Sequence, residues 1–203
     1  MPKTYIVEHL DPELEAWSAL EYAAIARESH ASNSTFMLSS VPTTLVLPNK
    51  LRDAEGFVVS HESVESLYPD KSKVCLLDPA ATTELAPEDG KKFEVFLFGG
   101  ILGDDPPRDR TSELRKKGFE GRRLGPVQMT TDTAVRVTRL VVEGKKALEG
   151  IEWVDNPELK FGKHESTTMP FRYVKAQNGG PVMPEGMIDL IKDDAAKGLD
   201  DLL

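Results

Sequence analysis

Two glycine-bearing loops in this chain follow predicted strands and could bring the backbone close to a ligand. Gly99, Gly100 and Gly103 come after an apolar strand expected over residues 93–98, and Gly125 lies in a second turn further along. Glycine allows close approach because it has no Cβ. Ligands of α/β sheets bind beyond the carboxyl ends of the strands. We therefore expect the two loops, at the ends of neighbouring strands, to line one ligand crevice; two tight turns without a ligand are the alternative.

Acidic side chains gather at the end of the first loop. Asp104 follows the loop directly, Asp105 comes next, and Asp109 lies within a helix expected to begin at Pro107. Glu8, at the carboxyl end of the first expected strand, should point toward the same crevice. Carboxylates at such a place can hold a cationic group or accept a proton. The alternative for the aspartates is structural, since acidic residues before a helix cap it and suit its dipole.

Other reactive residue types give weaker signals. The single cysteine, Cys75, lies in an apolar strand, which favours an inert buried thiol over a nucleophile. The basic cluster formed by residues 115–117, Arg122 and Arg123 is typical of a solvated face, with an RNA-binding patch as the alternative. The histidines lie far apart without metal-ligand spacing, so no metal is expected. They are His9, His30, His61 and His164.

The composition describes a soluble globular protein with excess negative charge. The 203 residues suit one α/β domain with a modest extension, and 39% are apolar and 29% charged. No apolar run approaches the roughly 20 residues that span a bilayer. The first residues lack the features of a signal peptide, so we expect a cytoplasmic protein away from membranes. A net charge of −9 disfavours nucleic-acid binding and favours a basic partner.

Strand-like and helix-like segments alternate along the first 150 residues. This alternation predicts parallel strands joined by crossover helices. The expected strands cover residues 4–9, 36–41, 56–59, 73–77, 93–98 and 119–124, and the expected helices cover residues 12–30, 63–68, 80–88, 107–117 and 130–143.

From Ile151 onward the pattern changes to short strand-like pieces and a final helix that begins near Met187. We therefore predict two units, a main domain over residues 1–150 and a small C-terminal module over residues 151–203. The strand-like pieces cover residues 151–153, 160–161 and 171–174.

Three loops of the main domain resemble the cofactor loops of the SPOUT methyltransferases. Residues 124–134, LGPVQMTTDTA, resemble the third loop, whose usual form is LGxxILRxETA. FGGILG at residues 98–103 resembles the second loop, and LLDP at residues 76–79 resembles the first. The order of GGILGD, PPRDRT, QMTTDTA, MPFRYV and MPEGM narrows the resemblance. This combination of motifs is similar to that of the eukaryotic SPOUT branch that methylates an arginine on the third protein of the small ribosomal subunit.

This resemblance implies an α/β fold in which helices flank a parallel sheet and the three loops form a deep C-terminal trefoil knot. In that family the knot binds S-adenosylmethionine in a bent form, and the product is S-adenosylhomocysteine. Side chains such as Phe98 and Met129 would enclose its apolar portions. The cofactor-binding residues implied here are Leu77, Asp78, Phe98, Gly99, Gly100, Ile101, Leu102, Gly103, Leu124, Gly125, Gln128, Met129, Thr130, Thr131 and Ala134.

The resemblance also implies an arginine side chain as the methyl acceptor. A guanidinium stays charged at physiological pH, so carboxylates are needed to hold its fork and to take a proton as the methyl moves. We expect Asp104 in this role, with Asp109 and Glu8 as further candidates. Thr130 stands where many RNA-modifying relatives have an arginine, which fits a cationic substrate. Asp132 replaces the usual glutamate and is expected to cap the helix.

The leading hypothesis is an S-adenosylmethionine-dependent protein arginine N-methyltransferase that acts on a basic protein of the small ribosomal subunit, without direct nucleic-acid contact. Two alternatives stay open: an RNA methyltransferase of the same fold that uses the basic cluster, and a non-catalytic module that keeps the cofactor pocket. We expect a monomer rather than the homodimer usual in the family, because aromatic side chains of the C-terminal module can cover the dimer surface. These are Trp153, Phe161, Phe171 and Tyr173.

Overall fold

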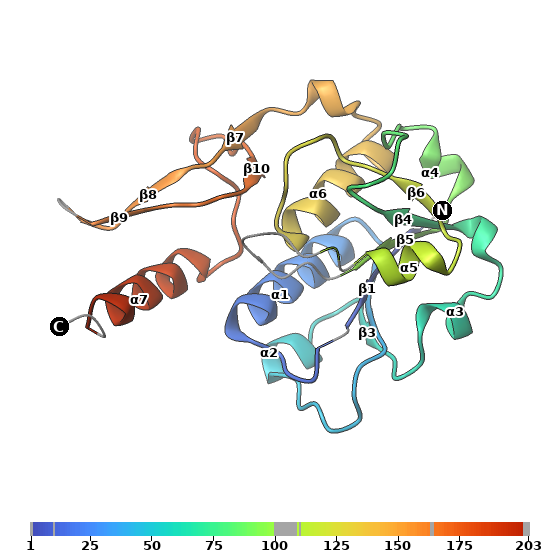
Figure 1. The fold of residues 1–203 in the computed structure, drawn as a ribbon, viewed down its shortest axis with the longest axis horizontal. Helices are drawn as coiled ribbons and strands as arrows, with labels where there is room; N and C mark the ends of the chain where they lie inside the picture. The colour runs from blue at the N-terminus through green and yellow to red at the C-terminus, as the bar shows by residue number, and fades with distance from the viewer. Residues whose placement is uncertain (1, 10, 100–108, 110, 163–164, 201–203) are drawn as a thin grey trace.

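The computed structural model describes residues 2–9, 11–99, 109, 111–162 and 165–200, and its central element is a six-stranded sheet. The strands are β1 (Thr4–Glu8), β2 (Thr35–Ser39), β3 (Phe57–Val59), β4 (Val74–Leu77), β5 (Val95–Phe98) and β6 (Glu120–Arg122). Their order across the sheet is β3-β2-β1-β5-β4-β6, and every neighbouring pair is parallel (Figure 1). The predicted α/β fold with a parallel sheet is therefore confirmed.

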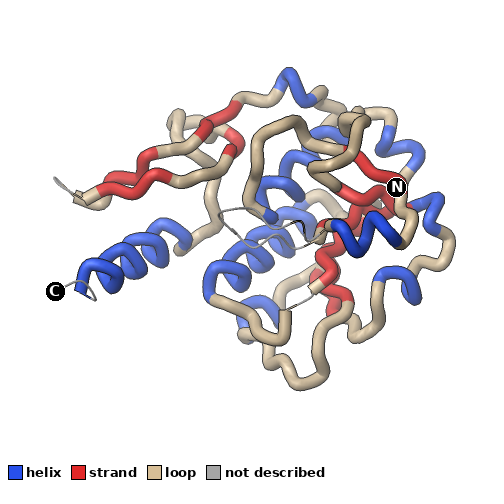
Figure 2. The backbone as a smooth tube through the Cα atoms, in the orientation of Figure 1, coloured by secondary structure: helices blue, strands red, loops and turns tan. Residues whose placement is uncertain are grey.

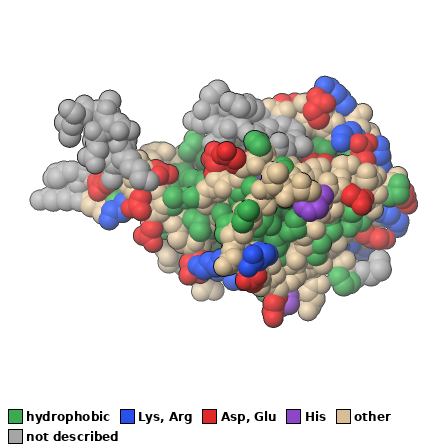
Figure 3. Space-filling view, turned by 90° about the horizontal axis from the view of Figure 1, so that it is seen from below, with side chains coloured by type: hydrophobic (Ala, Val, Ile, Leu, Met, Phe, Trp, Pro, Cys, Tyr) green, Lys and Arg blue, Asp and Glu red, His purple; other side chains and the backbone are tan. Residues whose placement is uncertain are grey.

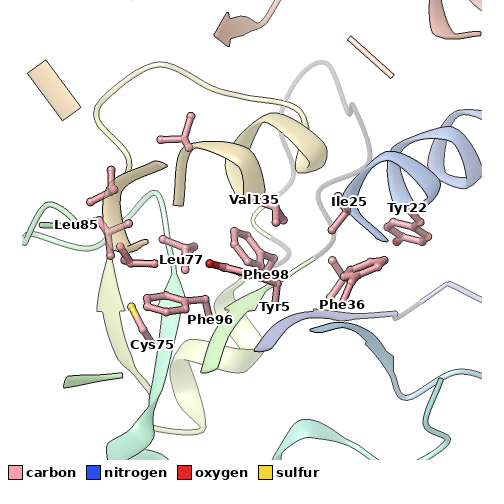
Figure 4. Packing of buried hydrophobic residues seen from close by; sticks show 14 of the residues in the cluster. Tyr5, Tyr22, Ile25, Phe36, Cys75, Leu77, Leu85, Phe96, Phe98 and Val135 are labelled. Carbon is pink, nitrogen blue, oxygen red and sulfur yellow. The ribbon is translucent and has the colours of Figure 1, made fainter. Parts of the chain in front are cut away.

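Helices flank the sheet on both faces, which explains why the strands read as continuous apolar runs. The helices are α1 (Ala16–Ala31), α2 (Asn49–Arg52), α3 (Val64–Leu67), α4 (Asp89–Lys92), α5 (Ser112–Lys116) and α6 (Thr131–Val142), with single turns η1 (Lys71–Lys73) and η2 (Leu148–Gly150). Successive strand side chains point to opposite faces, so Tyr5 joins one hydrophobic cluster and Ile6 the other. Ile25 of α1 and Val135 of α6 cover the first cluster (Figure 4). Helices α3 and α5 contribute to the second.

The start of the first helix and the order of the strands differ from the prediction. Helix α1 begins at Ala16 rather than at Pro12, since Glu15 just before it has an extended backbone, with φ −73° and ψ 159°. The two glycine loops do not follow neighbouring strands, because β4 lies between β5 and β6. As a result, Asp78 at the end of β4 stands between the ends of β5 and β6.

Residues 80–88 form turns, so the helix predicted there is wrong. The backbone N–H of Arg123 donates to the carbonyl of Thr83 at 2.9 Å, and the N–H of Leu85 donates to the carbonyl of Arg123 at 3.0 Å. Backbone groups that bond to the end of β6 cannot also close helical hydrogen bonds. The other helices and strands predicted up to residue 143 are confirmed where the structure describes them, with ends shifted by a few residues.

The C-terminal part projects to one side of the sheet (Figures 1 and 2). It contains the antiparallel pairs β7 (Trp153–Asp155) with β10 (Arg172–Val174) and β8 (Glu158–Lys160) with β9 (Ser166–Thr168), followed by α7 (Met187–Asp200). Strand β9 was not predicted. A third hydrophobic cluster, which includes Phe171 and Tyr173, packs against Trp17 and Leu20 of α1. The division into two units at residue 150 stays a prediction.

No helix in the described part of the chain is both long and apolar enough to cross a membrane.

Candidate functional site

A cavity of about 390 Å³ lies at the carboxyl ends of β4 and β5 and along the segment that joins β6 to α6. Its size falls within the range of small-ligand sites, and its place is the usual one for a ligand in an α/β sheet. The strand ends contribute residues 77–80 and 98–99, and the joining segment contributes residues 123–129. The start of α6 contributes Thr131 and Ala134. The wall is completed by Asp109 and Thr111, which precede α5, and by Arg115 within it.

The wall contains most of the described residues that were predicted to bind the cofactor. They are Leu77, Asp78, Phe98, Gly99, Leu124, Gly125, Gln128, Met129, Thr131 and Ala134. Thr130 is not on the wall; it is buried, and its hydroxyl lies 2.7 Å from the Asp132 carboxylate. Gly100, Ile101, Leu102 and Gly103, predicted as cofactor-binding, and Asp104, predicted as catalytic, lie outside the described residues. Pro79, Pro126 and Val127 on the wall lie within the loops that carry the resemblance, whereas Ala80, Thr111, Arg115 and Arg123 are outside the prediction.

One part of the wall is apolar and has room for a ligand. Leu77 and Phe98 belong to the first hydrophobic cluster, and Leu124 and Met129 pack against it. Gly125 has a φ of +88°, and a Cβ built on it would meet none of the surrounding described atoms within 4 Å. The glycine is therefore needed for its backbone conformation, and the space beside it is open to a ligand.

The opposite part of the wall is an ionic corner built around Asp78. Arg115 donates from Nε and Nη2 to the two oxygens of Asp78 at 2.5 and 2.7 Å, and from Nη1 to Asp109 at 3.1 Å. Thr111 donates to the same carboxylates. The Asp78 side chain is 3% exposed, and burial alone would raise its pKa. The hydrogen bonds from Arg115, Ala80 and Thr111, together with the charge of Arg115, outweigh burial and lower the pKa. With two carboxylates and one guanidinium, the corner carries a net charge of −1.

This corner corrects the prediction for part of the basic cluster. Arg115 keeps 38% of its side chain exposed, but two carboxylates hold it in the cavity wall rather than on an open face. Arg122 is largely buried and pairs with Asp89 at 3.0 Å. Lys116, by contrast, is 71% exposed and fits the predicted solvated face. Residue type alone does not distinguish an arginine held by carboxylates from one on an open face.

The two described candidates for the catalytic carboxylate occupy different places. Asp109 lines the cavity, but it precedes α5 rather than lying inside the helix, and its hydrogen bonds from Arg115 lower its pKa. Glu8 is not among the described residues that line the cavity, so the prediction that it points there is wrong. Its buried carboxylate accepts from the hydroxyls of Ser39 and Ser40 and ties β1 to β2.

Comparison with known proteins decides the family. A family model described as "Protein arginine N-methyltransferase SFM1-like" matches residues 4–198. The chain belongs to this family. It is 47% identical over 214 residues to the protein arginine N-methyltransferase SFM1 of Saccharomyces cerevisiae, covering 98% of this chain and 99% of the yeast protein. A crystal structure of the yeast arginine methyltransferase SFM1 complexed with SAM has a TM-score of 0.88 and 45% identity, covering 97% of this chain and 92% of that one.

A more distant likeness concerns the fold alone. The structure of a dual specific Trm10 from Thermococcus kodakaraensis is 15% identical, with a TM-score of 0.50 over 73% of this chain and 96% of that one. The sheet and its flanking helices are thus similar to those of SPOUT methyltransferases.

Within this SFM1-like chain, the start of α6 departs from the predicted arrangement. Asp132 does not cap the helix: its buried carboxylate pairs with Arg136 at 3.1 Å. The backbone N–H of Thr131 instead donates to Glu21 of α1 at 3.1 Å. A residue from another helix thus satisfies an N–H that local capping rules assign to a residue close in sequence.

Proposed function

We propose that this protein is an S-adenosylmethionine-dependent protein arginine N-methyltransferase. The observation that carries the proposal is the cavity, whose wall gathers described residues from all three loops implied by the family resemblance. The yeast relative, 45% identical over nearly the whole chain, has been crystallised with SAM. No group of three or more His, Cys, Asp or Glu side chains in the described chain is placed to hold a metal ion, and the proposed reaction uses none.

The residues of the cavity fit S-adenosylmethionine. Leu77, Phe98, Leu124 and Met129 would hold its apolar portions, and the open space beside Gly125 leaves room for it. The ionic corner, with its net charge of −1, suits a ligand whose sulfonium, ammonium and carboxylate groups sum to a net charge of +1. When bound, this cofactor supplies an electrophilic methyl group: the carbon–sulfur bond breaks as a carbon–nitrogen bond forms, and the electron pair stays on sulfur.

The protein's contribution is orientation and proton transfer. A guanidinium delocalises its charge over three nitrogens, so a carboxylate must hold its fork and leave one nitrogen free to attack. The attacking nitrogen loses one proton, which a carboxylate accepts. We propose Asp104 as that acceptor, because it follows the second loop directly. Asp109 is a weaker candidate, since Arg115 already occupies its oxygens.

The proposed substrate is a basic protein of the small ribosomal subunit, methylated in the cytoplasm. The net charge of −9 supports a basic partner over a nucleic acid. On the face shown in Figure 3, acidic side chains lie scattered among basic and apolar ones, so no continuous positive surface stands out there. Arg115 and Arg122 are engaged with carboxylates, which weakens the alternative of an RNA-binding patch.

We further propose that the three loops are threaded as a trefoil knot and that the protein is a monomer. Phe171 and Tyr173 support the second point, because both are buried in the third hydrophobic cluster rather than offered to a partner. Sedimentation equilibrium should give 22.4 kDa; twice that mass at micromolar concentration would contradict the monomer.

Transfer of a labelled methyl group tests the function directly. The native protein is incubated with labelled S-adenosylmethionine and with separated protein and RNA fractions of small ribosomal subunits. We expect label in arginine of a basic protein. Label in RNA would favour the RNA methyltransferase, and binding of cofactor without any transfer would favour the non-catalytic module.

A further inference from the structure

A second group of polar side chains lies buried beside the cavity, behind the start of α6. Glu21 of α1 is 0% exposed and Tyr173 of β10 is 1% exposed. Oε1 of Glu21 accepts the hydrogen bond from the N–H of Thr131, and Thr131 itself lines the cavity. One residue therefore separates this buried group from the proposed cofactor site.

Three polar atoms of this group make no well-formed hydrogen bond to another described residue, although the indole of Trp17 lies close enough to Glu21 to favour its charged form. They are Oε2 of Glu21, Nε1 of Trp17 and the hydroxyl oxygen of Tyr173. Trp17 precedes Glu21 by four residues on α1 and so lies on the same helix face, and it packs against the cluster that contains Tyr173. Buried polar atoms in native proteins nearly always have a partner in protein, water or ligand. Their convergence from two elements indicates that a polar ligand group belongs here.

The chemistry of the three side chains matches a guanidinium in a peptide. A guanidinium only donates hydrogen bonds, and both Glu21 and Tyr173 offer an acceptor oxygen. Its flat face stacks on aromatic rings such as the indole of Trp17. The indole N–H of Trp17 is a donor that favours the charged form of Glu21, the form that would hold a guanidinium.

The charge around Glu21 also favours a cation. Asp132 pairs with Arg136, which pairs with Glu28 at 2.6 Å, and Glu28 pairs with Arg139 at 3.1 Å. With Glu21 ionised, the three carboxylates exceed the two guanidinium groups by one negative charge. Burial and the charge of Asp132 raise the pKa of Glu21 well above its usual range. Burial therefore favours the neutral carboxyl group, and a bound cation would favour the charged form.

We propose that Trp17, Glu21 and Tyr173 form the subsite that binds the guanidinium of the substrate arginine. This inference rests on the proposed function and adds the residues that recognise the substrate. Glu21 would hold the fork directly, while Asp104 stays the proposed proton acceptor.

The first test is Glu21→Gln, which keeps the acceptor for the Thr131 N–H and removes the charge. The matched control is Glu15→Gln, which removes the same charge from an exposed position just before the same helix. For a basic peptide that the native protein methylates, we expect the KM of Glu21→Gln to rise by about ten- to hundredfold, from the loss of a charged hydrogen bond. Cofactor affinity should stay within threefold, and the control should match the native protein throughout.

The second test reports on the site without any enzymatic activity. The chain has two tryptophans, so a Trp153→Phe background leaves Trp17 as the sole tryptophan, which excitation at about 295 nm selects over the tyrosines. With S-adenosylhomocysteine present, the arginine peptide should shift the Trp17 emission. The same peptide with citrulline, which has the shape of arginine without its charge, should leave the emission unchanged.

The outcomes separate this inference from the proposed function. If the native protein methylates the peptide while Glu21→Gln keeps a KM within threefold of native, the subsite lies elsewhere and the proposed function stands. If the native protein transfers no methyl group to protein, the proposed function fails. If Glu21→Gln does not fold, the emission test decides: equal responses to the arginine and citrulline peptides, or none, overturn the subsite.

Discussion

The ion pair between Asp78 and Arg115 gives the sharpest test of how the cavity is held together. Asp78→Asn keeps an acceptor for the backbone N–H of Ala80, which lies 2.9 Å from Oδ1, but loses the charge that receives two N–H groups of Arg115. Hydrogen bonds to charged groups contribute about 1.5–3 kcal/mol. Arg115 is 38% exposed, and solvent screening keeps the loss near the lower end, about 2 kcal/mol. For a chain of this length, that loss lowers Tm by roughly 4–8 °C.

A second bidentate pair provides the matched control for this experiment. Arg172 donates to Asp155 at 2.6 and 2.7 Å, with nearly the same geometry, but the Asp155 side chain is 45% exposed. Asp155→Asn should therefore cost less than about 1 kcal/mol. Urea unfolding of the native protein and both variants measures the free energies of unfolding. Equal losses in the two variants would refute the reasoning that burial of Asp78 makes its ion pair matter.

The pair between Asp78 and Arg115 also predicts how the free energy of unfolding depends on pH. The pKa of Asp78 is lowered in the folded state, so its stabilising effect is present above the unfolded pKa of about 3.9 and is lost as the pH falls through the folded pKa. The difference in unfolding free energy between the native protein and Asp78→Asn should therefore be full at pH 6 and should shrink below about pH 4. A difference that stays constant down to the acid unfolding transition would mean that the pKa of Asp78 is not lowered.

Three further variants and one reagent test the cavity, the chemistry and the core. Gly125→Ala forces an alanine to a φ of +88° in the cavity wall and should weaken S-adenosylmethionine binding by at least tenfold in calorimetry. The control is Gly118→Ala, at a φ of +84° with equally open surroundings away from the cavity. Both variants should lose about 1 kcal/mol of stability, but the control should keep the affinity. Asp104→Asn should keep cofactor affinity and lower methyl transfer by about ten- to hundredfold; near-normal turnover would move the proton-acceptor role to another carboxylate. Lys116→Glu reverses an exposed charge and should leave protein methylation intact. Loss of protein methylation in this variant, together with label in RNA, would favour the RNA methyltransferase. Cys75 is buried, and burial raises the pKa of its thiol, so maleimide should label it only at the rate of unfolding.

The strands could be predicted because the sheet is covered on both faces. Residues 74–77 and 95–98 are buried without exception, and such runs of apolar residues admit few other interpretations. The helix predicted over residues 80–88 failed for a reason that lies outside that segment. Its backbone groups bond to Arg123, a residue about forty positions away, and no local pattern reports a partner at that distance.

The candidate site could be predicted in its glycine loops but not in its charges. Gly125 stands where the chain needs a positive φ, a requirement that residue type itself reveals. Arg115 was placed on a solvated face because its neighbours Lys116 and Lys117 suggest one. Its position depends on the strand order, which sets β4 between β5 and β6 and brings Asp78 within reach of Arg115.

At the start of α6, a contact between residues far apart in the sequence again replaces the one expected locally, and here the contact bears on the proposed function. Capping rules assign Asp132 to the helix terminus, and they would be sufficient if α6 stood alone. In the folded protein Glu21 takes that place from α1, and Asp132 pairs with Arg136. Burying Glu21 costs free energy that a neutral residue would not cost, since its pKa is raised by burial and by Asp132. Glu21→Gln should therefore be more stable than the native protein at pH 7 and progressively less so, relative to native, toward pH 5. If Glu21 binds the substrate, the Glu21→Gln variant should gain stability and lose affinity for the arginine peptide. If Glu21 has a purely structural role, the variant should keep that affinity.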